Sequence, residues 1–358
     1  MARVAFYAPM KSPDSPKPSG DREMARNLMQ ALTAEGETVD LATDLRIYDK
    51  SGDEDLQQAL RRAAEDEAKR LVSDLPSDTD LWVTYHNYYK APDLLGPRVC
   101  KARGIPYVQL ESTRASSRLN GPWAEFAKAA HQACDAADVI FYHTANDLIT
   151  LQRDRFGDQA LVELPPFLPI SELPPAATGG APMLTVGMMR HGDKLASYQI
   201  LSEALAHLTG DWHLNIAGDG PARRQVEALM APFGQRVRFL GQLDREELQR
   251  VYQQSSLLAW PGVNEAYGMI YLEAQAAGLP VVAQDRPGVR DVLSPAAYPS
   301  VESGARGFAD GMQALLSDST LRHTLGAAAR NYVAERHLMP QATERLWATL
   351  RPLLKDAS

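Results

Sequence analysis

The chain has 358 residues, of which 45% are hydrophobic and 23% are charged, a composition typical of ordinary soluble globular proteins. This length exceeds the size at which a single hydrophobic core stops growing, so we expect two domains. The net charge is -8. Because nearly all of it lies before residue 181, the first half is a poor candidate for wrapping nucleic acid or docking on anionic lipid.

The N-terminal residues and the cysteines indicate the expected compartment. The chain enters a strand-like run without a charged leader, and it has no run of roughly 18 apolar residues, which a membrane span needs. We therefore expect a cytoplasmic protein. Cys100 and Cys134 lack a Cys-x-x-Cys pattern and histidines at ligand spacing, which favours buried free thiols over a disulfide or metal site.

The first half of the chain alternates short β-branched runs with amphipathic helical stretches, the pattern of a parallel sheet covered by crossover helices. Helices are predicted at residues 20–34 and 53–75. Strands are predicted at residues 3–8, 38–43, 81–86, 107–111, 139–143 and 161–164. These elements predict a Rossmann-like domain over residues 1–170.

A segment with six prolines and two glycines, residues 165–182, predicts a linker between the domains. The alternation then resumes and predicts a second Rossmann-like domain over residues 181–337, in which Asp244 and Glu247 have the spacing of a capping box. A last helix within residues 339–358 is expected to pack back on the first domain. The second domain's strands are predicted at residues 184–187, 214–217, 237–240, 257–260 and 281–283.

The fold class is therefore α/β, with two doubly wound domains whose ligands bind at the carboxyl ends of the strands. At one such end, Tyr267 or Gly268 is predicted to open a helix. Residues 267–269 would then offer amides without helical partners and the positive end of the helix dipole, which suits an anion. Glu265 and Glu273 flank this point and would suit sugar hydroxyls; on spacing alone, two solvent-facing acids that stabilise the dipole are an open alternative.

The run from Asn264 to Ala283 resembles the glutamate, seven residues, glutamate motif of the family 4 retaining glycosyltransferases of the GT-B type. Val186-Gly187 with Lys194, and Pro287-Gly288, match in the same order, as do residues 216–221 and 239–241. The resemblance covers nearly all of residues 181–337. It implies two Rossmann-like domains that face a cleft, with the nucleotide sugar bound mainly to the second and the acceptor to the first.

The resemblance also implies roles for residues around the donor. Glu265 would contact the donor sugar's hydroxyls and Glu273 the ribose. The diphosphate would lie against the helix start at Tyr267, Gly268 and Met269.

The family has an arginine directly after the glycine of the Val-Gly pair and a lysine a few residues later, both on the donor diphosphate. Here Met188 follows Gly187, so Arg190 and Lys194 are the candidate cations, with a solvated loop as the alternative for each. Fixed positive groups would stabilise charge that builds on the departing β-phosphate.

Three further positions are expected beside the donor: Gly218, Asp219 and Gly241. Gly218 and Asp219 form a predicted tight turn in which Asp219 caps the next helix. A dinucleotide-binding loop is disfavoured because Arg223 replaces the third glycine and the turn does not follow the domain's first strand.

In the first domain, the long loop at residues 9–20 is expected to be functional or mobile, and the resemblance places Gly20 near the transferred sugar's phosphate. His86 ends a strand and is expected at the edge of the cleft, with a core or turn histidine as the alternative. Glu111 stands where many members of the family have a histidine. It would hydrogen-bond a hydroxyl group or cap the following segment.

The resulting prediction is a retaining hexosyltransferase that moves a sugar from a UDP- or GDP-linked donor to a hydroxyl of a glycan or lipid-linked acceptor, as in polysaccharide biosynthesis. We expect no cofactor, and no metal because no Asp-x-Asp triplet adjoins the donor motifs and Lys194 with the helix amides can balance the charge. The acidic first half argues against a nucleic acid partner. Peripheral membrane contact has no support from charge. Two alternatives remain: a nucleotide-sugar epimerase of GT-B fold, and a non-catalytic nucleotide-sugar-binding protein.

Overall fold

The computed structural model describes residues 1–17, 19–179 and 182–354. Its contacts divide the chain into two compact units: unit 1 comprises Met1–Pro165 and the segment that begins at Ala342, and unit 2 comprises Pro166–Gln341. Pro18 of the predicted loop, residues 180–181 of the proline-rich segment and residues 355–358 of the last predicted helix lie outside the described residues.

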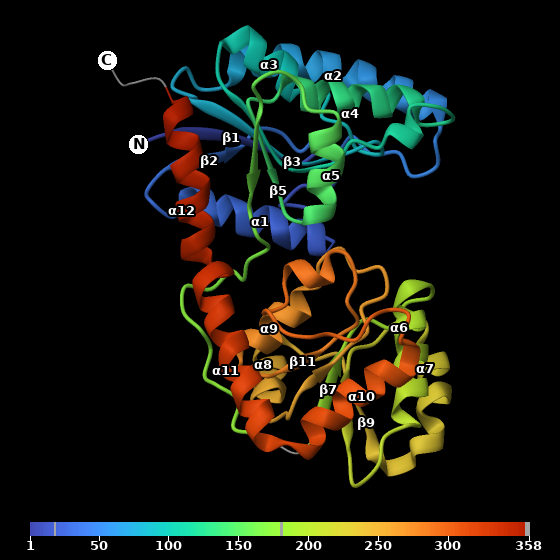
Figure 1. Ribbon diagram of the computed structural model, residues 1–358. Coiled ribbons are helices and arrows are strands. Elements are labelled where there is room, and N and C mark those ends of the chain that lie inside the picture. The colour runs from blue at the N-terminus through green and yellow to red at the C-terminus, as the bar shows by residue number, and fades with distance from the viewer. Residues whose placement is uncertain (18, 180–181, 355–358) are drawn as a thin grey trace. The chain divides into compact units, whose positions relative to one another are not determined.

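Unit 1 contains a six-stranded sheet with the order β2-β1-β3-β4-β5-β6, and each neighbouring pair of strands is parallel. Helices α2, α3 and α4 cover one face of the sheet and α1 lies on the other (Figure 1). The strands are β1 (Arg3–Tyr7), β2 (Thr38–Leu41), β3 (Leu81–Asn87), β4 (Tyr107–Ser112), β5 (Val139–Tyr142) and β6 (Ala160–Glu163). The helices are α1 (Gly20–Thr33), α2 (Glu54–Asp74), α3 (Gly96–Arg103), η1 (Ser116–Arg118), α4 (Ala124–Ala136), α5 (Ala145–Arg153) and, from the end of the chain, α12 (Met339–Leu350) and η4 (Arg351–Leu353).

Unit 2 contains a five-stranded sheet with the order β11-β10-β7-β8-β9, again parallel throughout. Helices α6, α7 and α10 lie on one side of it, and α8, α9 and α11 on the other (Figure 1). The strands are β7 (Met183–Val186), β8 (Leu214–Ala217), β9 (Val237–Gly241), β10 (Leu258–Ala259) and β11 (Val281–Val282). The helices are α6 (Asp193–Leu205), α7 (Arg223–Met230), η2 (Ala231–Arg236), α8 (Arg245–Gln253), α9 (Met269–Ala276), η3 (Val289–Asp291), α10 (Gly304–Ser317) and α11 (Ser319–Arg336).

The predicted α/β class with two Rossmann-like, doubly wound domains is therefore confirmed. Local predictions also agree with the structure. The Asp244 carboxylate accepts a hydrogen bond from the Glu247 amide at 2.8 Å, and the Glu247 carboxylate accepts one from the Asp244 amide at 3.0 Å, so the capping box is confirmed. Cys100 and Cys134 are buried free thiols, as expected.

The described part of the proline-rich segment is fastened to unit 2 by backbone hydrogen bonds. The Leu168 amide donates to the His337 carbonyl at 2.7 Å, and the Ala177 amide donates to the Ala277 carbonyl at 2.7 Å. Because proline restricts the backbone and these bonds fix it at both ends, the segment is held along unit 2.

Helix α12 contributes its apolar face to unit 1 from Ala342 onward. Leu346, Trp347 and Leu350 are buried. The Trp347 indole N–H donates to the Leu32 carbonyl at 3.1 Å, at the end of α1. A buried indole thus finds the acceptor it requires, and the end of the chain becomes part of the first unit's core.

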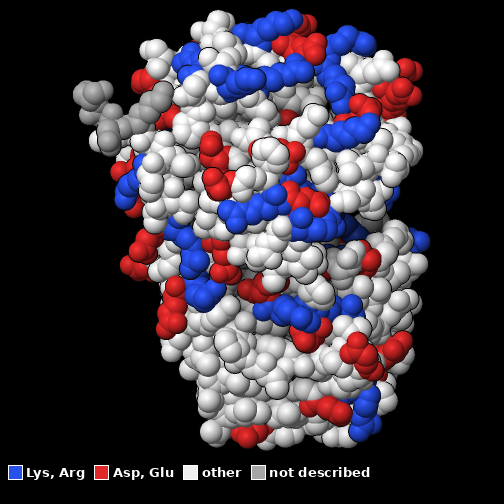
Figure 2. Space-filling model, turned by 45° about the horizontal axis from the view of Figure 1, so that its top comes forward, with Lys and Arg blue, Asp and Glu red and all other residues white. Residues whose placement is uncertain are grey.

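Charges of both signs are mixed on one face of the molecule. On the face drawn in Figure 2, Lys and Arg side chains intermingle with Asp and Glu side chains. None of the helices among the described residues combines the length and the apolar character that crossing a membrane requires.

Replacement of Trp347 tests the contribution of α12. Trp347→Ala removes a side chain that is 1% exposed, and it should lower the free energy of unfolding by about 3 to 5 kcal/mol. Glu344→Ala, at an exposed position of the same helix, is the matched control and should change stability by less than about 0.5 kcal/mol. Chemical denaturation followed by circular dichroism measures both, and equal effects would show that α12 does not complete the core.

Candidate functional site

The strand order of unit 2 contains a point at which the chain reverses direction along the sheet. Strands β7, β8 and β9 are added towards one edge, whereas β10 and β11 are added on the other side of β7. Crevices outside the carboxyl ends of strands at such a point are the usual ligand sites of doubly wound sheets. Unit 2 therefore has a preferred location for a ligand beside the ends of β7 and β10.

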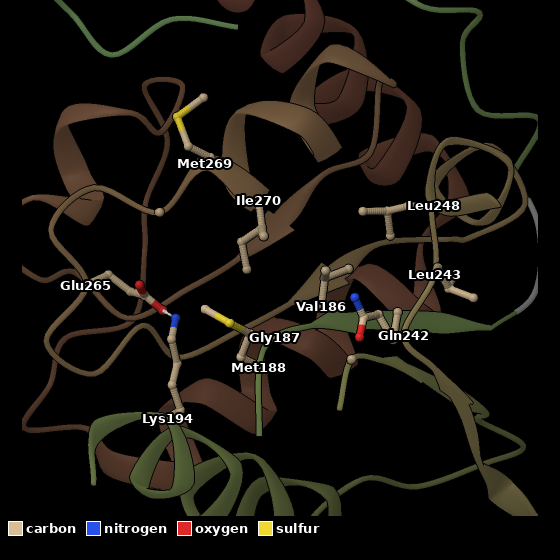
Figure 3. Close-up of a pocket in the computed structure, with 13 residues that line it drawn as sticks. Val186, Gly187, Met188, Lys194, Gln242, Leu243, Leu248, Glu265, Met269 and Ile270 are labelled. Carbon is tan, nitrogen blue, oxygen red and sulfur yellow. Dashed lines mark hydrogen bonds and ion pairs between the residues drawn. The ribbon is translucent and has the colours of Figure 1, made fainter. Parts of the chain in front are cut away.

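A pocket of about 240 Å³ lies at this location. Figure 3 shows Lys194 and Glu265 pointing toward each other on one side, Gln242, Leu243 and Leu248 on the opposite side, and Met188 between them. Most of the lining side chains are apolar. The lining residues are Val186, Gly187, Met188, Lys194, Ala217, Gly218, Gln242, Leu243, Leu248, Glu265, Gly268, Met269 and Ile270.

The floor of the pocket depends on close approach between three strand ends. The Gly187 amide donates to the Ala217 carbonyl at 3.0 Å, and the Gly218 amide donates to the Gly241 carbonyl at 2.7 Å. Gly218 has a φ of 138°, and a Cβ atom there would overlap the Gly187 carbonyl. Only glycine allows this contact, so Gly218 and Gly241 shape the floor, and Gly218 itself lines the pocket.

Helix α9 turns its amino end toward the pocket. The helix begins at Met269, one or two residues later than predicted, and Gly268 is its N-cap with a φ of 73°. Gly268, Met269 and Ile270 all line the pocket. Since the first amides of a helix have no partner within the helix and carry the positive end of its dipole, this wall favours an anion.

Lys194 and Glu265 form an ion pair in the pocket although they are 71 positions apart. The same carboxylate oxygen, Glu265 Oε1, also accepts a hydrogen bond from the Trp260 indole at 2.9 Å. Lys194 Nζ lies 5.6 Å from the centre of the Trp260 ring. The buried Trp260 therefore holds both charged groups, one by a hydrogen bond and one through its ring face.

Glu273 lies on α9 but does not line the pocket. Its Oε2 atom accepts a hydrogen bond from the buried Tyr252 hydroxyl at 2.9 Å. Burial raises the pKa of Glu273, and the Tyr252 hydrogen bond opposes that effect only in part. The predicted contact between Glu273 and a ribose stays a prediction.

Other donor-side candidates occupy different positions. Arg190 is exposed and does not line the pocket, whereas Met188 does. The predicted capping role of Asp219 is wrong: Asp219 Oδ2 pairs with Arg223 at 2.8 Å, and the N-cap of α7 is Ala222, without a side-chain cap. Tyr267 is half-buried and packs against the core of unit 2.

In unit 1, His86 and Glu111 lie at the carboxyl ends of β3 and β4. Both residues have positive φ, 67° and 55° respectively. His86 Nδ1 lies 3.3 Å from Asp21 Oδ1 at the start of α1, and Glu111 Oε2 lies 3.7 Å from Nε2 of the buried His143. Glu111 therefore faces a histidine, and it does not cap the next helix, η1, whose N-cap is Ala115 without a side-chain hydrogen bond.

The surroundings of His86 favour its charged form. Burial alone would lower the pKa of His86, but the nearby carboxylates of Glu111 and Asp21 outweigh that effect, so the pKa is raised. Gly20, the first residue of α1, precedes Asp21 directly and has open space where a Cβ atom would stand. The structure thus brings Gly20 and His86 to the same edge of unit 1.

Sequence reasoning missed two aromatic partners of the candidate carboxylates, Trp260 and Tyr252. Both are buried and carry a polar hydrogen, so each needs an acceptor. That requirement is the signal that could have linked them to nearby glutamates. Sequence reasoning also missed most of the apolar residues that line the pocket, because strand-end and loop residues such as Val186 and Leu243 follow no distinctive pattern.

Comparisons with known proteins find glycosyltransferases. Residues 184–332 match the family model described as Glycosyl transferases group 1. The D-inositol 3-phosphate glycosyltransferase of Xylanimonas cellulosilytica is 34% identical over 139 residues, which is 37% of this chain. The chain spans only 33% of that curated relative's length.

Solved structures resemble the chain over nearly its whole length. Sucrose-phosphate synthase from Thermosynechococcus elongatus has a TM-score of 0.72 at 18% identity, with 99% of both chains covered. HepE of Anabaena in complex with UDP and glucose has a TM-score of 0.70 at 14% identity, with 98% of this chain and 100% of that chain covered. At such identities the likeness establishes the fold, which is GT-B.

The Lys194–Glu265 pair can be tested without a ligand. Their side chains are 25% and 12% exposed, so Lys194→Gln or Glu265→Gln alone leaves a poorly hydrated charge and should lower the free energy of unfolding by about 2 kcal/mol. The free energy of unfolding of the double variant should be closer to that of the wild type than the sum of the two single losses predicts. Urea titration measures these values, with the exposed pair Lys69 and Asp66 as control; strict additivity would show that the pair does not interact.

The raised pKa of His86 predicts a pH dependence of stability. A histidine whose pKa is raised by folding stabilises the folded state fully below its unfolded pKa of about 6.5, and that stabilisation is lost as pH rises through the folded pKa. The Tm should therefore fall more steeply above about pH 6.5 in the wild type than in His86→Gln. Calorimetry measures the Tm of both proteins over this pH range. Parallel curves of Tm against pH would contradict the assigned charge of His86.

Proposed function

We propose that this protein is a family 4 retaining glycosyltransferase that moves a sugar from a nucleotide diphosphate sugar to a hydroxyl group of a glycan or lipid-linked acceptor. The observation that supports it most is the pocket at the strand-order reversal of unit 2, where Lys194 and Glu265 meet the amino end of α9. The match of residues 184–332 to Glycosyl transferases group 1 points the same way.

The pocket provides different chemistry at its two sides. Val186, Leu243 and Leu248 suit the flat, weakly polar face of a nucleobase, and Gln242 adds hydrogen-bonding groups. Glu265 suits sugar hydroxyls on the opposite side. At about 240 Å³ the pocket is smaller than the roughly 300 Å³ of the smallest drug-sized sites, so it would hold part of a nucleotide sugar while the rest extends outward.

The proposed reaction depends on charge that develops at the leaving diphosphate. As the bond from the sugar to the β-phosphate breaks, negative charge grows on the phosphate oxygen, and Lys194 with the first amides of α9 stabilises it more in the transition state than in the ground state. The acceptor oxygen bonds to the anomeric carbon from the face that the phosphate leaves, and the leaving phosphate accepts the hydroxyl proton, so configuration at the anomeric carbon is retained. We propose that this charge balance makes a metal ion unnecessary.

The donor can be identified with a panel of radiolabelled UDP- and GDP-sugars. HepE of Anabaena was solved with UDP and glucose, which makes UDP-glucose the first donor to test. Transfer to an added carbohydrate with retained configuration supports the proposal. Interconversion of the sugar without transfer would indicate an epimerase, and binding without turnover would indicate a non-catalytic protein.

Variants at two positions separate donor binding from turnover. Lys194→Ala should lower kcat by about 100-fold with a smaller change in donor Kd, because the ammonium acts mainly in the transition state. Glu273→Ala should raise the Kd of the nucleotide by about tenfold, as expected for a lost hydrogen bond to a charged group. Lys101→Ala, at an exposed position of α3, is the control. Wild-type kinetics in both site variants would overturn the site assignment.

A further inference from the structure

Unit 1 has a cluster of aromatic and cationic side chains that the proposed donor chemistry does not use. The rings of Tyr89 and Trp123 meet edge to face, with centroids 5.7 Å apart and an interplanar angle of 88°. Lys90 and Arg118 lie over both rings. We call these four residues the acceptor platform. Tyr89 and Lys90 follow β3, and Arg118 and Trp123 follow β4, so the platform lies at the ligand-binding edge of this sheet.

The two cations of the platform face aromatic carbon and no carboxylate. Lys90 Nζ lies 5.5 Å from the Tyr89 ring centre and 5.4 Å from that of Trp123, and Arg118 Cζ lies 5.2 Å and 5.6 Å from the same centres. Within the described part of the chain, neither forms an ion pair. Both cations therefore lie against the same two rings without a carboxylate partner, and the anionic group of a ligand would supply one.

Hydrogen bonds to the buried residues Asp49 and Gln57 hold the Trp123 side of the platform in place. The Trp123 indole N–H donates to the Asp49 carbonyl at 3.3 Å, and the Gln57 amide donates to the Pro122 carbonyl at 2.9 Å and to the Asp49 carboxylate at 2.7 Å. Burial would raise the pKa of Asp49, but the hydrogen bonds from Gln57 and from the backbone amides outweigh it and lower the pKa. The Trp123 ring is therefore positioned before any ligand binds.

Ring contacts connect the platform to His86. The Tyr88 and Tyr89 rings meet edge to face with centroids 5.6 Å apart, and the His86 and Tyr88 rings lie 4.7 Å apart. A molecule lying along Tyr89 would therefore extend toward the histidine at the end of β3.

We propose that the acceptor platform binds the anionic group, a phosphate or carboxylate, of a carbohydrate acceptor. The apolar face of a sugar ring packs on Tyr89 and Trp123, while Arg118 and Lys90 contact the anion, with the planar guanidinium able to bond two of its oxygens. A neutral glycan would leave both cations unmatched. The inference rests on the proposed function, because it names the acceptor class of the same reaction.

Calorimetric titration with three soluble probes tests the platform: glucose, glucose 6-phosphate and glucuronate. The charged sugars should bind at least about tenfold more tightly than glucose, and Lys90→Gln with Arg118→Gln should abolish that difference. Lys101→Gln, which removes a charge from α3, should preserve it. Arg118→Lys should restore part of the preference, and Trp123→Ala should weaken all three sugars because it removes the packing surface.

A second arm separates the sources of the anion. Flotation with phosphatidylcholine vesicles, with and without phosphatidylinositol, reports an anionic group carried by a lipid. Binding only to phosphatidylinositol vesicles, lost in the double variant, supports the proposal with a lipid-linked acceptor. The proposal is overturned if all three sugars bind equally and the protein binds neither kind of vesicle. It is also overturned if the double variant binds the charged sugars as tightly as the wild type does. UDP titration is run in parallel: if UDP binds normally while the platform fails, only the acceptor class is wrong, whereas absent UDP binding undermines the proposed function.

Discussion

The candidate donor site depends on the close approach of neighbouring parallel strands at their carboxyl ends. The amides of Gly187 and Gly218 donate across this edge to the carbonyl groups of Ala217 and Gly241, which satisfies backbone groups that would otherwise face the pocket without partners. Because a side chain at Gly218 would overlap the Gly187 carbonyl, the floor consists of bare backbone. The opening beside it is therefore available to a ligand.

Electrostatic balance is the second constraint on this pocket. Lys194 and Glu265 neutralise each other in a site with mostly apolar walls, and an isolated charge there would be poorly hydrated. A diphosphate would offer Lys194 a new anion, while sugar hydroxyls would offer Glu265 new donors. Trp260, which donates to Glu265 through its indole, keeps that carboxylate in place during the exchange. On the proposed function, binding would thus replace the ion pair with new partners for both groups, so that neither Lys194 nor Glu265 would be left without one.

The fold could be predicted from sequence more completely than the site. Strand β8 has the predicted bounds, and β1 and β9 differ from the prediction by one residue, because β-branched runs and their spacing follow directly from burial in a parallel sheet. Periodicity does not indicate which side chains meet across 71 positions, so the ion pair between Lys194 and Glu265 could not be foreseen. Arg190 shows the converse: it is close in sequence to the expected cation position, yet its exposed side chain lies away from the pocket.

Backbone strain provides an independent marker of both candidate regions. Among the described residues, the non-glycine positions with positive φ are His86, Glu111 and Asn264. This conformation costs an ordinary residue about 1 kcal/mol or more, so it persists where surrounding contacts impose it. His86 and Glu111 fall between the paired positions Tyr85–Leu110 and Asn87–Ser112 of the same two strands, so the two strained residues occupy matching positions.

Asn264, the third of these residues, immediately precedes Glu265 and donates to the Asp193 carboxylate at 2.9 Å. That bond ties the loop before α9 to the first turn of α6, which also carries Lys194. The strained residue therefore fixes the two segments whose side chains form the ion pair. In each unit, an unfavourable backbone conformation therefore lies beside the charged groups at the carboxyl edge of the sheet: in strands β3 and β4 of unit 1 and in the loop before α9 of unit 2.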